Sequence, residues 1–298
     1  MAKLMHSGKR KTVKAVAHKA KATRPACVMK PEYLAEIRRF RLMDDDFMSK
    51  CLEHAPECIE FILRIILCKK DLKVIKAQTE YPIKSLQGRG VRFDVFAKDS
   101  KGREYDIEIQ RSNVGSDAKR ARYNSALMDA NALKSGDDIG KLRDTYVIFI
   151  TENDVMGGGK AAYHVDRKIQ EMRGKDFGDG THIIYVNGAT QSKTDIGNLV
   201  HDFRCRDVAE MHFDVLKRQV GYFKNSEEGR RYMCEAMERI EARGEARGRA
   251  EGVARGKRET MLATAKRMLK DGILALKDIA RYSGLSLAQV KKLQASMV

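Results

Sequence analysis

The chain has 298 residues, of which 43% are hydrophobic and 33% charged, and its formal net charge is +17. This length can bury a sizeable core in one large domain with appendages. No apolar run approaches the roughly 18 residues that a transmembrane helix needs, which argues against a membrane protein. The positive charge favours a polyanionic partner, and nucleic acid or an anionic membrane surface would both satisfy it.

The cysteines form no CxxC pair and no compact framework, which is typical of reduced core residues. No apolar stretch follows the basic residues at the N-terminus, so no secretory signal is predicted. Both observations favour a cytoplasmic protein. The cysteines are Cys27, Cys51, Cys58, Cys68, Cys205 and Cys234.

Composition and patterning divide the chain into four segments. Residues 1–30 contain nine Lys and Arg and no acid, which predicts a disordered basic tail. An α/β domain is expected over 32–222, followed by a charged helix or linker over 223–260 with a Gly/Arg repeat. A small helical segment should occupy 261–298.

Alternating helical and strand patterns indicate the α/β class within 32–222. Acids at Asp44, Asp45 and Asp46 can cap a first helix, which breaks at Pro56 before a second one. Thr145–Thr151 is β-branched and aromatic and should be a strand buried on both faces. Further strands are expected over 72–84, 91–98, 104–111 and 182–186, with later helices near 195–204 and 207–220.

A helix is expected from Asp117 to about Lys134, between the strand-rich zone and the buried strand. Its apolar and small residues recur at helical spacing, which predicts one buried face. That face should contain Tyr123, Leu127, Ala130 and Leu133.

Two patterns mark the C-terminal quarter. Glycines recur at every fourth position from 244 to 256, which indicates either a helix with a stripe for close approach or a weakly helical linker. Residues 278–293 have helix–turn–helix spacing, with a turn at Gly284 and a cap at Ser286. This unit would either read DNA in a major groove or form a packing hairpin.

The segment from Gly90 to Gln110 has the alternation of a β-hairpin with a turn at Ser100, Lys101 and Gly102. Pairing the residues that flank this turn places Asp94 directly across from Glu108, with their Cβ atoms about 4.5–5.5 Å apart. Gln110 lies on the same face as Glu108.

Two carboxylates at this distance repel each other unless a cation lies between them. Oxygen ligands of this kind suit Mg²⁺, which phosphate groups of a substrate can complete. The ion can lower the pKa of bound water and neutralise charge on a transferring phosphoryl group. The alternative interpretation is the solvated polar face of an amphipathic hairpin.

The Asp94 and Glu108-Ile109-Gln110 pattern resembles the transposase-like branch of the PD-(D/E)XK nuclease superfamily, the recombination-promoting nucleases. That branch typically has Glu-x-Gln where other branches have Glu-x-Lys. The resemblance covers roughly residues 32–270. It extends to the flanking stretch 87–94, the helical segment 119–127, the opening residues 44–47 and the Gly/Arg-repeat tail.

The resemblance implies a restriction-endonuclease-like mixed sheet flanked by helices, with a helical C-terminal extension. It also implies DNA phosphodiester cleavage with Mg²⁺ or Mn²⁺ and a role in recombination or transposition. Asp94 and Glu108 would bind the metal with the carbonyl of Ile109, and Gln110 would fill the slot more often held by Lys. The superfamily usually adds an acid from its first helix, here Asp46 or Glu60.

Basic residues around the hairpin are candidates for nucleic-acid contacts, because Arg can bind phosphate through two hydrogen bonds. A solvated helix face is the alternative for those on the helix after the hairpin. The candidates are Arg92, Arg111, Arg120 and Arg122.

Two other functional classes fit the same sequence. A catalytically inactive nuclease fold could bind nucleic acid in a salt-sensitive way, although paired carboxylates would hinder DNA binding without a metal. Alternatively, the glycine-striped segment could serve as an interaction scaffold, and homo-oligomers could form through the C-terminal helical region.

Overall fold

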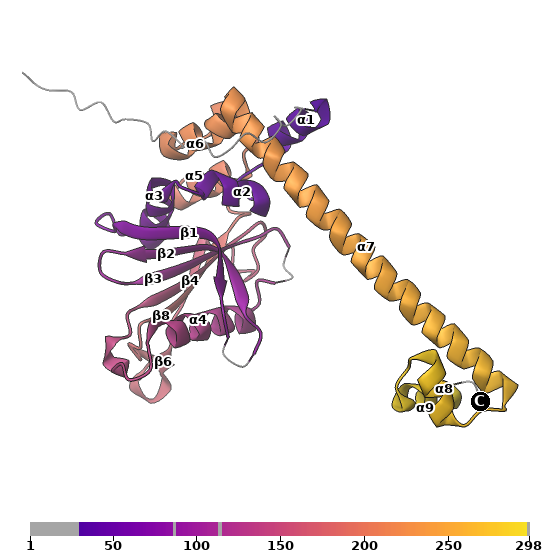
Figure 1. Cartoon of the computed structure of the whole chain (residues 1–298). Coiled ribbons are helices and arrows are strands. Elements are labelled where there is room, and N and C mark those ends of the chain that lie inside the picture. The colour runs from indigo at the N-terminus through magenta and orange to yellow at the C-terminus, as the bar shows by residue number, and fades with distance from the viewer. Residues whose placement is uncertain (1–29, 86–87, 113–114, 297–298) are drawn as a thin grey trace, which may run out of the picture.

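The computed structural model describes residues 30–85, 88–112 and 115–296 (Figure 1). The basic tail expected over 1–30 lies outside these residues except for Lys30. The helices are α1 (Pro31–Arg39), α2 (Asp45–Leu52), α3 (Pro56–Leu67), α4 (Ala118–Ala132), α5 (Asp195–Arg204), α6 (Asp214–Asn225), α7 (Glu227–Asp271), α8 (Leu276–Ser283) and α9 (Leu287–Ala295). The strands are β1 (Val74–Ile83), β2 (Val91–Asp99), β3 (Glu104–Gln110), β4 (Thr145–Thr151), β5 (Ala162–Val165), β6 (Lys168–Ile169), β7 (Lys175–Asp176) and β8 (Thr181–Asn187).

A mixed six-stranded sheet with the order β1-β2-β3-β4-β8-β5 forms the centre of the fold. Its first three strands are antiparallel, β3, β4 and β8 run parallel, and β5 returns antiparallel to β8. The predicted restriction-endonuclease-like α/β sheet with flanking helices and a helical C-terminal extension is confirmed.

Helices cover both faces of this sheet, which explains why every residue of β4 is buried. The core on one face joins the sheet to α2, α3, α5 and α6. A smaller core on the other face joins it to α4, which lies against the opposite side in Figure 1. The break at Pro56 lies where the sequence predicted it, and Asp44 is the N-cap residue of α2, although its side chain forms no capping hydrogen bond.

The buried face of α4 differs from the predicted one. Leu127 is buried, but Tyr123 is 39% exposed and Ala130 is also exposed. The inward face contains Asn124 and Ser125, which are both buried. A search for apolar periodicity missed this face because half of it is polar.

Helix α6 begins at Asp214 rather than near residue 207. A 3-10 turn over Val208–Glu210, capped by the Asp207 side chain, takes the place of the expected first turn. The buried carboxylate of Asp202 then accepts the amide hydrogens of His212 and Phe213, which holds the chain in position for α6.

Helix α7 is one continuous helix of 45 residues, so the expected boundary at 260 falls inside it. It projects beyond the sheet domain to a C-terminal unit (Figure 1). There α8 and α9 pack on the end of α7 around Ala265, Ile279 and Val290. Gly284 ends α8 with a φ of 76°, and Ser286 begins α9 with a capping box, as the helix–turn–helix spacing predicts. A role in reading DNA stays a prediction.

Among the helices of the described ranges, none has both the length and the apolar character needed to cross a bilayer.

Two glycines of α7 should respond in opposite ways to substitution by Ala. A β-carbon on Gly229 would lie 2.2 Å from the carbonyl oxygen of Tyr222, so Gly229→Ala should lower the free energy of unfolding by about 1–3 kcal/mol. No atom lies within 4 Å of the corresponding position on Gly252. Gly252→Ala should therefore stabilise the helix by about 1 kcal/mol. Thermal unfolding followed by circular dichroism measures the stability of both variants. A loss of stability in Gly252→Ala would contradict the conclusion that this position has room for a β-carbon.

Candidate metal centre

The β2–β3 hairpin brings Asp94 and Glu108 together. The strands pair Val95 with Ile107 and Lys98 with Glu104, and this register continued by one residue sets Asp94 opposite Glu108. Here the amide of Ile109 donates to a side chain and not to a backbone carbonyl of β2, because its acceptor is Asp94 Oδ2 at 2.8 Å. The pairing counted outward from the Gly102 turn is therefore present in the structure.

A third acid, Asp106, lies on the same face and was given no role by the sequence. The side chains of Asp106 and Glu108 are completely buried, and Asp94 is half-buried. Asp106 Oδ2 accepts a hydrogen bond from Asn124 Nδ2 of α4 at 2.8 Å. Among the described residues, no donor reaches Asp106 Oδ1 or Glu108 Oε1, and the two carboxyl groups lie close enough to share a proton. Two buried acceptor atoms are thus left for a proton or a cation.

Burial and mutual repulsion disfavour the charged forms of these acids. Burial, followed by the charges of Glu108 and Asp45, raises the pKa of Asp94 to about 8. Burial and the charge of Glu108 raise the pKa of Asp106 well above its usual range. The pKa of Glu108 is also raised by burial, although Arg120 opposes this shift.

Arg120 supplies the positive charge that the structure places against Glu108. Its guanidinium forms an ion pair with Glu108 Oε2 and also donates to the Gly115 carbonyl at 3.2 Å. The Asp117 side chain caps the first turn of α4 by accepting from the amides of Lys119 and Arg120. In this structure Arg120 therefore reaches into the acid cluster and is not on a solvated face.

Gln110 and Arg120 meet at Gly115. A β-carbon on Gly115 would lie 2.9 Å from Gln110 Oε1 and 3.0 Å from Arg120 Nη1, and its φ is 104°. Only glycine readily adopts this conformation and leaves room for both side chains. The predicted site residue Gln110 thus lies beside the cation of the site.

The other predicted Arg residues lie outside the acid cluster. Arg92 pairs with Glu80 at 3.2 Å, and Arg111 pairs with Asp44 at 3.1 Å and Glu152 at 3.6 Å. Arg122 is exposed on α4. Their role in binding nucleic acid stays a prediction.

The electrostatics of Asp94 indicate a further acid from the first helices, beside the two expected ones. Glu60 accepts the amide hydrogen of Val74 at 2.8 Å and pairs with Arg64, so it joins α3 to β1. Asp45, at the first position of α2, is close enough for its charge to raise the pKa of Asp94. Asp45 and its neighbour Asp46 are both exposed, and which acid of the first helices joins the site stays a prediction. Three consecutive acids cannot be separated by pattern alone, because their directions depend on how α2 docks.

Residues 58–204 match the family described as PD-(D/E)XK nuclease family transposase. The chain is similar to this family over that segment, which is just under half of its length. The matched segment runs from α3 to the end of α5 and contains the whole β2–β3 hairpin with its acids. No curated protein and no solved structure matches the chain.

An open cleft of about 420 Å³ lies at the start of α2. It is lined by acids that include Asp45 and Asp46 and by basic residues that include Arg111, but not by Asp94, Asp106 or Glu108. Arg side chains of this kind can bind phosphate through two hydrogen bonds. The full lining is Glu36, Arg39, Phe40, Arg41, Asp44, Asp45, Asp46, Arg111 and Arg206.

The metal-free PD-(D/E)XK domain should lose stability as the pH rises. The pKa of Asp94 is about 8 in the folded state, compared with its ordinary value of 3.8, so the folded state binds this proton more tightly. The folded state therefore holds more protons between about pH 4 and pH 8, and its stability falls across this window. Urea unfolding in EDTA at several pH values measures the slope. Asp94→Asn should flatten it, whereas Asp71→Asn, at an exposed acid, should not.

Removal of the Arg120 guanidinium should destabilise the metal-free protein. Arg120→Met leaves the buried Glu108 carboxylate without its partner, which costs about 1–3 kcal/mol. The lower end applies because 35% of the Arg120 side chain is exposed and solvent screens the pair. Arg122→Met, two residues along the same helix, should change stability by less than about 0.5 kcal/mol. Equal urea midpoints for the two variants would contradict the role given to Arg120.

Proposed function

We propose that the chain is a divalent-metal-dependent DNA endonuclease that acts in recombination or transposition. Its ion, Mg²⁺ or Mn²⁺, would be held by Asp94, Glu108 and the carbonyl oxygen of Ile109. The observation that carries the proposal is the fully buried Glu108 carboxylate, which lies close enough to Asp94 and Asp106 to raise the pKa of both. The family match over residues 58–204 supports a nuclease in general, and the ion and the DNA substrate are proposals.

The residues present fit such an ion. Asp94, Asp106 and Glu108 bring three acidic groups to one buried place, and Arg120 is the cation paired with them. The N–H of Ile109 donates to Asp94 on the neighbouring strand β2. Within a β-strand, the N–H and the C=O of any one residue point to the same neighbouring strand. The Ile109 carbonyl is therefore directed toward the same acid. A hard, oxygen-liganded ion suits this donor set.

The chain's own residues would position the DNA and stabilise charge. When bound, the ion supplies a water of lowered pKa and a counter-charge for the phosphate. Gln110 can orient a water through its amide beside the acids, and Arg111 at the cleft can contact a phosphate. Arg120, once Glu108 has another counter-charge, can turn its guanidinium to the scissile phosphate, where a positioned cation stabilises the transition state.

Cleavage of supercoiled plasmid with a panel of divalent ions tests the proposal. Asp94→Asn and Glu108→Gln keep the side-chain shapes but remove the charges that bind the ion, and each should lower the rate by about 100-fold or more. Glu104→Gln is the matched control, because Glu104 lies on the same strand but pairs with Lys98. Its cleavage should match the wild type and stop with EDTA.

Two results would overturn the proposal. Metal-dependent cleavage that persists in both Asp94→Asn and Glu108→Gln would show that these acids do not form the active site. Salt-sensitive DNA binding without cleavage by the wild type, with any ion of the panel, would instead favour a catalytically inactive nucleic-acid-binding protein. The cytoplasmic location and homo-oligomers through the C-terminal helices stay predictions.

A further inference from the structure

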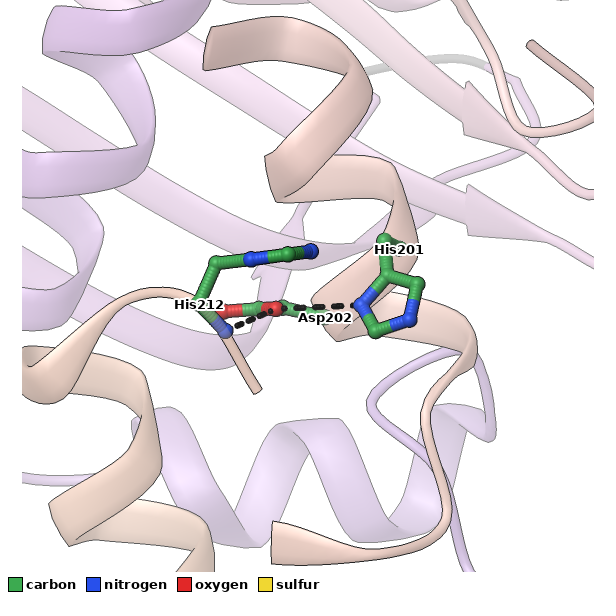
Figure 2. A group of neighbouring side chains, drawn as sticks. All are labelled: His201, Asp202 and His212. Carbon is green, nitrogen blue, oxygen red and sulfur yellow. Dashed lines mark hydrogen bonds and ion pairs between the residues drawn. The ribbon is translucent and has the colours of Figure 1, made fainter. Parts of the chain in front are cut away.

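His201, Asp202 and His212 meet where α5 ends and the chain turns toward α6 (Figure 2). One potential ligand atom of each lies within 4.8 Å of the other two. Sequence spacing could not reveal this group, because ten residues and a 3-10 turn separate Asp202 from His212.

Asp202 is held rigidly at the centre of the group. Its side chain is fully buried, Oδ1 accepts the amide of His212 at 2.7 Å, and Oδ2 accepts the amide of Phe213 at 2.9 Å. A carboxylate oxygen has two lone pairs, so each oxygen retains one after these bonds. The carboxylate is therefore both fixed in place and able to bind a further cation.

The two histidines are exposed, and their rings lie beside this carboxylate in Figure 2. The ring centroids are 4.6 Å apart at an angle of 59°. Nδ1 of His201 is 3.5 Å from Asp202 Oδ1, which is too long for a strong hydrogen bond. Among the contacts of the described residues, no other hydrogen bond of either ring is found. Their nitrogen lone pairs are thus available.

We propose that His201, Asp202 and His212 bind a divalent transition-metal ion of the Zn²⁺ type. Two imidazole nitrogens and one carboxylate oxygen are a common Zn²⁺ donor set, with water in the fourth position. Ligand atoms around tetrahedral Zn²⁺ are about 3.3 Å apart, given bonds of about 2.0–2.2 Å. Small rotations of the exposed imidazoles can reach this spacing.

This site is separate from the Asp94–Glu108 centre in both place and chemistry. Asp106, beside Glu108 on β3, bonds to Asn124 of α4, whereas α5 covers the opposite face of the sheet. The nuclease centre offers oxygen ligands for a hard ion, and this one offers nitrogen. A bound ion would tie the end of α5 to the entry of α6, which in turn packs against α7. Its role is therefore to stabilise the join between the sheet domain and the helical extension.

Calorimetric titration of the full-length chain with Zn²⁺ tests the site. The titration uses the Asp94→Asn/Glu108→Gln background, so that the nuclease centre does not contribute. A single equivalent should bind, and His201→Ala and His212→Ala should each weaken it at least about tenfold, the minimum cost even of a lost outer-shell partner. His164→Ala, at an exposed histidine on β5, should bind as the parent does.

Cys205 provides a second control, because it caps the end of α5 close to His201. Cys205→Ser should retain binding, and Co²⁺ in the site should give visible ligand-field bands without sulfur-to-cobalt charge transfer. Zn²⁺ should also raise the unfolding temperature of the parent but not of His201→Ala or His212→Ala. Unchanged Zn²⁺ affinity in both histidine variants, or its loss in Cys205→Ser, would overturn the site. Neither outcome depends on plasmid cleavage.

Discussion

The organisation of the domain depends on the cost of burying carboxylates. Strand β3 places Asp106 and Glu108 in the interior with no exposed side-chain surface, where an unpaired charge is strongly disfavoured. Asn124 donates a hydrogen bond to Asp106, Arg120 forms an ion pair with Glu108, and the pKa values of both acids are raised. These interactions do not satisfy both acids completely, because no donor among the described residues reaches one oxygen of each acid. A site left incompletely neutralised in this way is suited to attract a cation.

The need to satisfy these buried carboxylates also explains polar features of the neighbouring elements that apolar packing alone would not produce. The inward face of α4 contains Asn124 and Ser125, because it must meet acids as well as apolar side chains. The Asp117 cap fixes the first turn from which Arg120 extends, and Gly115 leaves room for the guanidinium. The backbone ladder ends where Asp94 takes the amide of Ile109. Local structure here follows the electrostatics of the site.

The sequence was sufficient for features that depend on nearby residues. Gly102 adopts a φ of 82°, as its place in the turn predicts, and counting from it gave the register that the strands keep from Lys98–Glu104 to Val95–Ile107. The cap at Ser286 and the turn at Gly284 are local in the same sense. Features that depend on docking were not predictable: the effect of Asp45 on the pKa of Asp94, the pairing of Arg120 with Glu108, and the meeting of His201 with His212. Apolar periodicity also failed on α4, where the buried stripe is partly polar.

The position of Arg120 bears on Gln110, which stands where other branches of the superfamily have Lys. A Lys at this place in the motif would hold a fixed positive charge beside the acids, and Gln110 cannot. Gln110 Oε1 and Arg120 Nη1 both lie next to Gly115. The Arg120 guanidinium from α4 is therefore close to the neutral amide of Gln110. The positive charge that Gln110 does not supply is therefore available from Arg120, ten residues later in the chain. Because this cation is on a separate helix, its pairing with Glu108 can change without any change in the β2–β3 register that sets the acids. The neutral residue in the motif thus does not argue by itself for an inactive fold.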